Sequence, residues 1–250
     1  MNAVTGERWT KNDIHELLSK GSWFGSLPEP MKDNILARGE IVRFEAGDTI
    51  FKVGDPVDGI YAVLEGDVRT YAPDDDGGRI FFRALGPGSW FGNAPLYFDP
   101  AMHVLEVRCA SAATALYLPE LAYREMTESD PATYRAFVQL MMAHSRHAVR
   151  LLLESRSEAP RRAARALLRL CRIHGVAGEG GTRLAIHLSQ ADLASLVGVS
   201  RQYMNELIAR WEAEGVLRWN GKSQPLLDIG RLRGLLGPLD AWIMNTDDWI

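Results

Sequence analysis

The spacing of apolar residues divides the chain into a helical start, a β-rich middle and a helical remainder. Residues 11–38 follow a helical pattern that breaks at "GSLPEP". From residue 40, short runs such as "EIVRF", "GIYAVLEGDVRTYA" and "HVLEVRCASAATALYL" alternate with glycine turns. Both alternating sets of positions in "IYAVLEG" are apolar, which predicts a strand buried on its two faces. This region therefore predicts a small antiparallel sandwich or jelly roll.

Beyond Pro119 the pattern becomes helical and stays so. A short helix over "LPELAYREMTESD" precedes a long one that begins at Pro131 and that we expect to end at Pro160. One stripe of the long helix has spacings of four and three, as in a coiled-coil seam: Tyr134, Val138, Met141, Ser145, Ala148 and Leu152. The alternative is a face that packs on its own domain. For so long a helix after a β domain, we favour a dimer seam.

A third helix is expected over residues 161–174. Its apolar side holds Ala163, Ala166, Leu167, Leu170 and Cys171, and five arginines lie mostly opposite: Arg161, Arg162, Arg165, Arg169 and Arg172. These arginines form a solvated face, or contact phosphate wherever they face a DNA groove.

The stretch "LSQADLASLVGVSRQYMNELIARWEAEGVL", residues 188–217, has the pattern of two short helices joined by a tight turn. Ser189 is a candidate N-cap for a helix over 190–197, and Gly198 permits the left-handed turn that follows. Ser200 caps the second helix. Its inward stripe has the spacing i, i+3, i+4, i+7: Met204, Leu207, Ile208 and Trp211.

The outward residues of the second helix are of the types that read base edges. Arginine pairs with guanine, and glutamine or asparagine pairs with adenine. Such residues in the first two turns predict a DNA-binding helix-turn-helix rather than an ordinary helical hairpin with a polar face. The "VLRWNGKSQPLLDI" stretch after it predicts a hairpin wing with an Asn220-Gly221 turn. Lys222 at its tip contacts phosphate or is a plain solvated turn residue. The candidate DNA contacts are Ser189, Gln190, Ser200, Arg201, Gln202, Tyr203, Asn205, Glu206 and Lys222.

The net charge of −4 does not oppose this reading, because the charge is unevenly distributed. Residues 160–222 carry ten Lys or Arg against five Asp or Glu, so the basic segment coincides with the helix-turn-helix. There is no run of 18 apolar residues and no secretion signal, so we expect a cytoplasmic protein without membrane contact. The two cysteines, Cys109 and Cys171, suggest neither a disulfide framework nor an iron-sulfur or zinc site.

The sequence has few of the residue patterns that an enzyme active site needs. Of six histidines, only His103 falls in the β-rich region, and no GxSxG, HExxH or phosphate-loop motif is present. We expect no catalytic residue, no metal and no cofactor. A cupin-like metalloenzyme is the remaining rival from another class.

The order of these parts resembles the CRP/FNR family of bacterial transcription regulators. The helix-turn-helix stretch carries the likeness, together with "FEAGDTIFKVGDPVDGIYAVLEGDV" and "GPGSWFGNAPLYF". The resemblance implies an α+β protein with an N-terminal cyclic-nucleotide-binding-like β-roll (1–130), a dimerisation helix (131–158) and a C-terminal winged helix-turn-helix (159–250). It also implies a homodimer that binds double-stranded DNA at a near-palindromic operator and acts with RNA polymerase.

The β-roll departs from members that bind cyclic AMP. Their phosphate cassette has Gly-Glu and, about ten residues on, Arg-Ser; here Gly92 is followed by Asn93, and His103 and Val104 stand at the second place. Buried phosphate needs a charged multidentate donor, so we expect cyclic AMP not to be the effector. Oxygen-sensing members use clustered N-terminal cysteines, which this chain lacks. A haem sensor needs an axial ligand, for which His103, His144 and His147 are conceivable. For each of them we favour the interpretation as an ordinary surface or core histidine.

What remains in the β-roll is a candidate pocket for an apolar or aromatic small molecule. Alternatively, the same side chains fill the space and the regulator works without an effector. The candidate pocket residues are Trp90, Phe91, Asn93, Leu96, Phe98, Met102 and His103.

The recognition helix also departs from the family. Many members have Glu where Gln202 stands and Arg where Glu206 stands, and read half-sites of the TGTGA or TTGAT type. A carboxylate at Glu206 only accepts hydrogen bonds, for example from cytosine N4. We therefore expect a different operator half-site.

Overall fold

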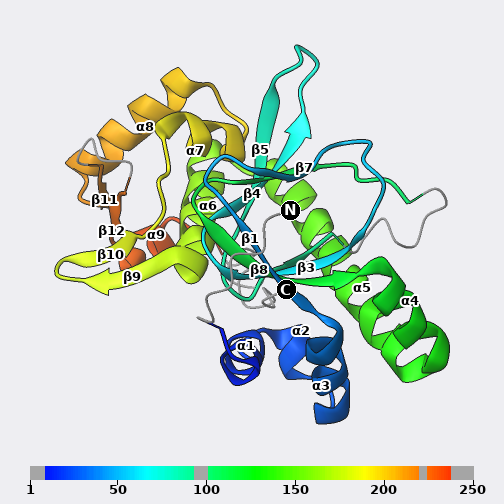
Figure 1. Ribbon diagram of the computed structural model, residues 1–250. Helices are drawn as coiled ribbons and strands as arrows, with labels where there is room; N and C mark the ends of the chain where they lie inside the picture. The colour runs from blue at the N-terminus through cyan, green and yellow to red at the C-terminus, as the bar shows by residue number, and fades with distance from the viewer. Residues whose placement is uncertain (1–8, 93–100, 220–223, 238–250) are drawn as a thin grey trace. The chain divides into compact units, whose positions relative to one another are not determined.

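The computed structural model describes residues 9–92, 101–219 and 224–237 (Figure 1). The contacts within the chain divide it into two compact units. The first holds the described residues up to Thr70 together with Leu85–His147. The second holds Tyr71–Ala84 and the described residues from Ala148 onward. The division by contacts falls between His147 and Ala148, and a hairpin of the β-rich region groups with the C-terminal unit. The expected domain bounds at residues 130 and 158 stay a prediction.

Two four-stranded antiparallel sheets form the β-roll. One has the order β1 (Glu40–Phe44), β8 (Ala113–Pro119), β3 (Gly59–Glu65) and β6 (Trp90–Phe91). The other has the order β2 (Thr49–Phe51), β7 (Glu106–Cys109), β4 (Val68–Pro73) and β5 (Arg79–Leu85). Six of the seven β3 residues are buried, as its apolar run predicts. The predicted antiparallel roll and the α+β class are confirmed.

Four short helices accompany the first unit: α1 (Lys11–Leu18), α2 (Ser22–Gly25), α3 (Glu29–Arg38) and α4 (Glu120–Ser129). Trp23 and Phe24 of α2 share a core cluster with Trp90 of β6 and Phe137. The indole N–H of Trp23 donates to the carbonyl of Ala136 at 2.7 Å. This core covers one face of the β1-β8-β3-β6 sheet.

The long helix α5 runs from Pro131 to Ser155 and therefore ends before Pro160. Pro160 lies instead in the first turn of the next helix, α6 (Ala159–His174). Proline is tolerated there because the first N–H groups of a helix have no partner within it. The prediction placed this proline at the wrong helix end, since a proline marks a boundary in either direction.

The C-terminal part of the second unit follows α6 with a hairpin, β9 (Gly175–Gly178) and β10 (Gly181–Leu184), and then α7 (Gln190–Val197) and α8 (Arg201–Ala213). Strands β11 (Leu217–Arg218) and β12 (Leu226–Leu227) and helix α9 (Ile229–Gly234) complete it. Its sheet has the order β11-β12-β10-β9. The sequence pattern missed β9, β10 and α9, because the β9–β10 segment is glycine-rich and α9 spans fewer than two turns.

Within the described ranges, none of the helices has the length and apolar character needed to cross a membrane. Cys109 and Cys171 are both free thiols. Burial raises the pKa of each to about 12, so both remain protonated at neutral pH.

Candidate nucleic-acid interface

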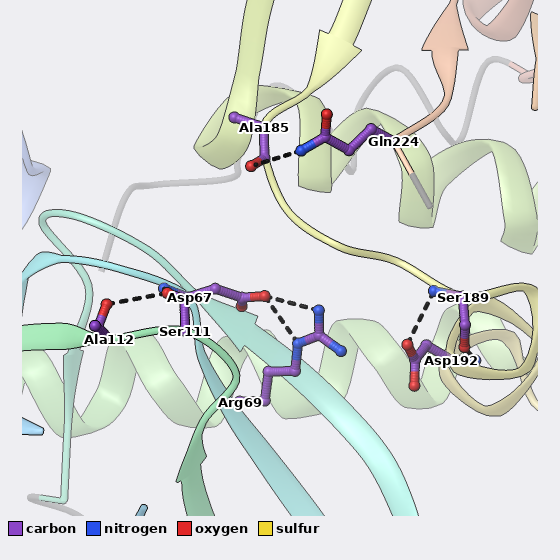
Figure 2. Close-up of polar contacts among 8 residues, drawn as sticks. All are labelled: Asp67, Arg69, Ser111, Ala112, Ala185, Ser189, Asp192 and Gln224. Carbon is purple, nitrogen blue, oxygen red and sulfur yellow. Dashed lines mark hydrogen bonds and ion pairs between the residues drawn. The ribbon is translucent and has the colours of Figure 1, made fainter. Parts of the chain in front are cut away.

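Helix α7 begins at a capping box. The Ser189 hydroxyl accepts from the Asp192 N–H at 3.0 Å, and the Asp192 carboxylate accepts from the Ser189 N–H at 3.0 Å (Figure 2). These two bonds satisfy N–H groups that the helix leaves free. Ser189 thus has a structural role as the predicted cap, beside its candidate role at DNA. Gln190, the first residue of α7, is half-buried.

The turn between α7 and α8 has the predicted chemistry. Gly198 ends α7 with φ 72° and ψ 50°, a left-handed conformation that glycine adopts without steric cost. Ser200 then caps α8, its hydroxyl accepting from the Tyr203 N–H at 3.1 Å. The tight turn fixes the angle at which α8 leaves α7.

Helix α8 separates its residues by burial as its sequence predicts. The inward stripe of Met204, Leu207, Ile208 and Trp211 is buried in the core of the second unit. The candidate base-reading residues are exposed: Arg201, Gln202, Tyr203, Asn205 and Glu206. The second helix of this helix-turn-helix therefore presents three residue types that pair with base edges in its first two turns.

Two exposed side chains of α8 are joined to each other. The Gln202 amide nitrogen donates to a carboxylate oxygen of Glu206 at 3.1 Å, one helical turn away. Sequence reasoning treated these two residues as separate readers, and their i, i+4 spacing is the signal that predicts the contact.

The wing is present as two short paired strands. Leu217 and Arg218 of β11 pair antiparallel with Leu227 and Leu226 of β12. The expected turn at Asn220-Gly221 and the candidate phosphate contact Lys222 lie outside the described residues. The base of the wing is tied to the recognition helix, because the Trp219 N–H donates to the Glu212 carboxylate at 2.7 Å.

Three of the five arginines of α6, Arg162, Arg165 and Arg169, differ from both readings that the sequence allowed. Of the five, only Arg161 is exposed, and Arg165 is fully buried. The Arg162 guanidinium donates to the backbone carbonyls of Ser157 and, at 3.0 Å, Val197. Arg162 therefore joins the α5–α6 connection to the end of α7.

Two further arginines bind the same connection. Arg165 donates to the Ser157 hydroxyl at 3.0 Å, and Arg169 forms a buried ion pair with Glu154 at 2.6 Å. Arg162, Arg165 and Arg169 follow helical spacing, so one face of α6 holds the last turn of α5 and the connection after it. We call these three residues the α6 clamp. The sequence alone did not identify it, because the partners are backbone groups, one hydroxyl and a single glutamate.

The hairpin of β4 and β5 contributes Tyr71–Ala84 to the second unit. Phe81 and Ala84 are buried in its core, and the Phe81 N–H donates to the hydroxyl of Ser195 on α7 at 2.8 Å. Burial, followed by the nearby guanidinium groups of Arg169 and Arg172, lowers the pKa of Arg83 to about 10. The hairpin is thus packed against the element that positions the recognition helix.

The candidate effector residues separate onto two faces of the β-roll. Trp90 packs with Trp23 and Phe24 on the helix-covered face. Phe91 and His103 contact Phe51 in the interior of the roll. Met102 is exposed, and Asn93, Leu96 and Phe98 lie outside the described residues. Of the four that the structure describes, Phe91 and His103 therefore share a neighbour, Phe51.

His103 is a poor candidate for holding phosphate. It is 3% exposed and stacks on Phe51 with ring centroids 3.5 Å apart. Desolvation lowers its pKa, opposed by the charges of Asp58 and Asp55, so the ring is neutral at pH 7. Its neighbour Val104 is 71% exposed. A buried guanidinium of the same unit, Arg69, is already engaged by Asp67 at 2.7 Å (Figure 2).

The candidate seam on α5 is only partly covered within one chain. Tyr134, Ser145, Ala148 and Leu152 are exposed, while Val138 and Met141 are half-buried. Met142, Val149 and Leu153 are exposed as well, although the predicted stripe omitted them. The opposite face is buried through Phe137 and Leu140, so α5 packs on its own unit and still presents apolar side chains outward.

The described ranges contain no cluster of three or more His, Cys, Asp or Glu residues placed to hold a metal ion. The histidine and carboxylate ligands that a cupin-like site needs are therefore not gathered in that part of the chain.

Comparison with known proteins matches two family models. Residues 41–130 match the cyclic nucleotide-binding domain, and residues 161–235 match the Crp-like helix-turn-helix domain. The transcriptional regulator SdrP of Thermus thermophilus is 30% identical over 199 residues, which cover 78% of this chain and 94% of SdrP. A CRP-like cAMP-activated global transcriptional regulator of Mycobacterium tuberculosis is 26% identical over 88% of this chain and 98% of its own.

Among solved structures, a transcriptional regulator of the CRP/FNR family from Thermus thermophilus superposes with a TM-score of 0.60 at 28% identity, covering 78% of this chain and 97% of its own. FixK2 from Bradyrhizobium japonicum gives a TM-score of 0.68 at 22% identity, covering 80% and 98%. At that identity the second likeness concerns the fold alone.

Proposed function

Since this chain belongs to the CRP/FNR family of transcription regulators, we propose that it binds a near-palindromic DNA operator as a homodimer, under the control of a small molecule other than cyclic AMP. The family is one of regulators rather than enzymes, and we propose no catalytic activity. RNA polymerase is proposed as a partner on the family likeness alone.

The observation that carries the proposal is the exposed face of α8. Its first two turns present Arg201, Gln202 and Asn205, while the buried stripe and two capped helix starts hold that face rigidly. A capped second helix with base-reading residues at its N-terminal end fits the major groove. The basic charge of residues 160–222 supplies attraction to the phosphate backbone.

The exposed apolar residues of α5 support the homodimer. Val149 and Leu152 lie on the side of the helix that the chain itself leaves open. Apolar side chains spaced along one long helix are suited to pairing with a second copy. In such a dimer the two α8 helices reach successive major grooves, about one helical turn or ~34 Å apart.

The departure from the phosphate cassette supports an effector other than cyclic AMP. His103 stands where the family's arginine is expected, and its buried, neutral ring offers at most one hydrogen bond to a phosphate. The described interior residues nearby are aromatic. An apolar or aromatic molecule therefore suits the roll better than a charged nucleotide.

One observation favours the alternative of an effector-independent regulator. Phe51 contacts Tyr61, Phe91 and His103, and Tyr61 stacks on Phe91 with centroids 5.2 Å apart. This aromatic cluster fills space inside the roll with the protein's own side chains. Thermal-shift screening with small metabolites separates the two cases, because an effector that binds the folded state raises the melting temperature as its concentration increases.

Selection of bound duplexes from a random pool tests the DNA-binding proposal. The expected result is an enriched symmetric sequence whose half-sites differ from the TGTGA and TTGAT types. Recovery of a common family half-site would contradict the expected change of specificity, and no enrichment at all would contradict the proposed function.

Calorimetric titration with cyclic AMP tests the effector proposal. We expect binding no tighter than the millimolar range, about −4 kcal/mol. Binding in the micromolar range would overturn the argument from His103 and Val104.

A further inference from the structure

We infer that Glu206 does not read a base itself but positions the Gln202 amide so that Gln202 reads adenine. The inference rests on the proposed DNA-binding function and deepens it by assigning one base of the operator. It starts from the hydrogen bond that joins two exposed residues of the recognition helix, from the Gln202 amide nitrogen to Glu206 at 3.1 Å.

The chemistry of the pair fixes which way the Gln202 amide faces. An ionised carboxylate has acceptors and no donor, so the atom that faces Glu206 must be the amide nitrogen rather than the amide oxygen. The usual ambiguity between the nitrogen and oxygen of a glutamine is thereby removed. One N–H of Gln202 is used by Glu206, and the amide oxygen and the second N–H remain for another partner.

The groups that remain match adenine. In the major groove adenine presents a donor at N6 and an acceptor at N7, and a glutamine amide pairs with both at once. Cytosine offers only the N4 donor and would leave the second N–H of Gln202 unused. The oriented pair therefore selects an A·T base pair within the half-site.

The arrangement also gives a carboxylate on a DNA-facing helix a role. The negative charge of Glu206 repels the phosphate backbone with or without the contact, because the Gln202 amide is neutral. The contact restricts the flexible Gln202 side chain before DNA arrives, which lowers the entropy cost of binding and offsets part of that repulsion. Both residues are exposed and one turn apart, as this role requires.

The test is selection from a random duplex pool with the full chain and three variants, Gln202→Ala, Glu206→Ala and Glu206→Gln. The wild type is expected to enrich adenine at one position of the half-site. At that position Gln202→Ala is expected to lower the preference for adenine by at least about fivefold. Glu206→Ala is expected to weaken the preference at that same position by roughly two- to tenfold. Glu206→Gln retains an acceptor for the Gln202 amide and is expected to keep most of the preference.

A double-variant cycle on the selected operator makes the test quantitative. The quantity compared is the affinity for the operator with adenine at that position, relative to operators with another base there. If Glu206 acts through Gln202, the double variant loses no more of this preference than Gln202→Ala alone. The control is Glu214→Gln, which removes one exposed negative charge just beyond the same helix without touching Gln202. It is expected to leave every base preference unchanged.

Three results overturn the inference while leaving the proposed function intact. In the first, Glu206→Ala loses a base preference that Gln202→Ala keeps. In the second, the losses of the two single variants add up in the double variant. In the third, Glu206→Ala has the same base preferences as the wild type. Failure of the wild type to enrich any sequence is a different result, because it contradicts DNA recognition itself.

Discussion

At the scale of single residues, burial separates the side chains that hold α8 from those that face outward. The sequence predicted this division, because apolar residues at i, i+3, i+4 and i+7 leave the others outside. It did not predict that Gln202 and Glu206 contact each other, nor that the adjacent Trp90 and Phe91 face opposite sides of their sheet. Both follow from ordinary helix and strand geometry applied to neighbouring residues.

Replacing Arg201 by alanine tests the proposed guanine reader. Loss of a bidentate pair is expected to weaken operator binding by about 1–3 kcal/mol, with little change for unrelated DNA. Arg210→Ala, which removes an exposed arginine later in the same helix, is the matched control for charge. Anisotropy titrations of both variants at one salt concentration provide the comparison, and equal losses for both would assign Arg201 to phosphate contact instead.

The buried ring of His103 predicts a pH dependence of stability. Its pKa is lowered in the folded protein, so the unfolded chain takes up a proton near pH 6.5 while the folded chain does so only at lower pH. The free energy of unfolding therefore falls as pH decreases below about 6.5. His103→Phe keeps the stacking on Phe51 and removes the titration, so its melting curves at pH 5.5 and 7.5 are expected to differ less than those of the wild type. An equal difference in both proteins would contradict this.

At the scale of elements, the sequence predicted helix boundaries best where a residue with specific cap chemistry stands at the boundary. Helix α7 begins and ends at the expected residues, because Ser189 and Gly198 carry specific cap chemistry. Helix α5 ends at Ser155, where the sequence has no such signal, and the following residues are held by the α6 clamp instead. The clamp contacts arise from tertiary packing, which a periodicity does not encode.

The buried ion pair between Arg169 and Glu154 predicts how substitutions in the α6 clamp change stability. Arg169→Leu leaves the buried Glu154 carboxylate without this partner and is expected to destabilise the protein by about 3–5 kcal/mol. The double variant Arg169→Leu with Glu154→Leu removes both charges and is expected to recover most of that loss. Chemical denaturation of the three proteins checks it. A double variant as unstable as the single one would show that the pair is not the source of the effect.

At the scale of the whole molecule, the resemblance of sequence motifs indicated the order of the parts but not how they are grouped. The hairpin Tyr71–Ala84 belongs by sequence to the β-roll, yet it packs in the C-terminal unit through Phe81 and its bond to Ser195. Contacts between residues more than a hundred positions apart leave no local pattern.

The proposed seam on α5 predicts that substitutions in it weaken the homodimer. Leu152→Glu places a carboxylate in the apolar seam and is expected to weaken dimerisation by at least about 100-fold. Leu121→Glu is the control, because Leu121 lies on α4 rather than on the seam helix and both leucines are 69% exposed. Light scattering after size-exclusion chromatography measures the mass of each. A dimeric Leu152→Glu variant would place the interface elsewhere.

The most direct test of the central claim is the stoichiometry of the complex between the full chain and its selected operator. The expected result is two chains per duplex, two protected segments about one helical turn apart in a footprint, and a large loss of affinity when one half-site is scrambled. One chain per duplex, with a single protected segment and no effect of scrambling either half, would contradict the account of a dimer that reads a symmetric site.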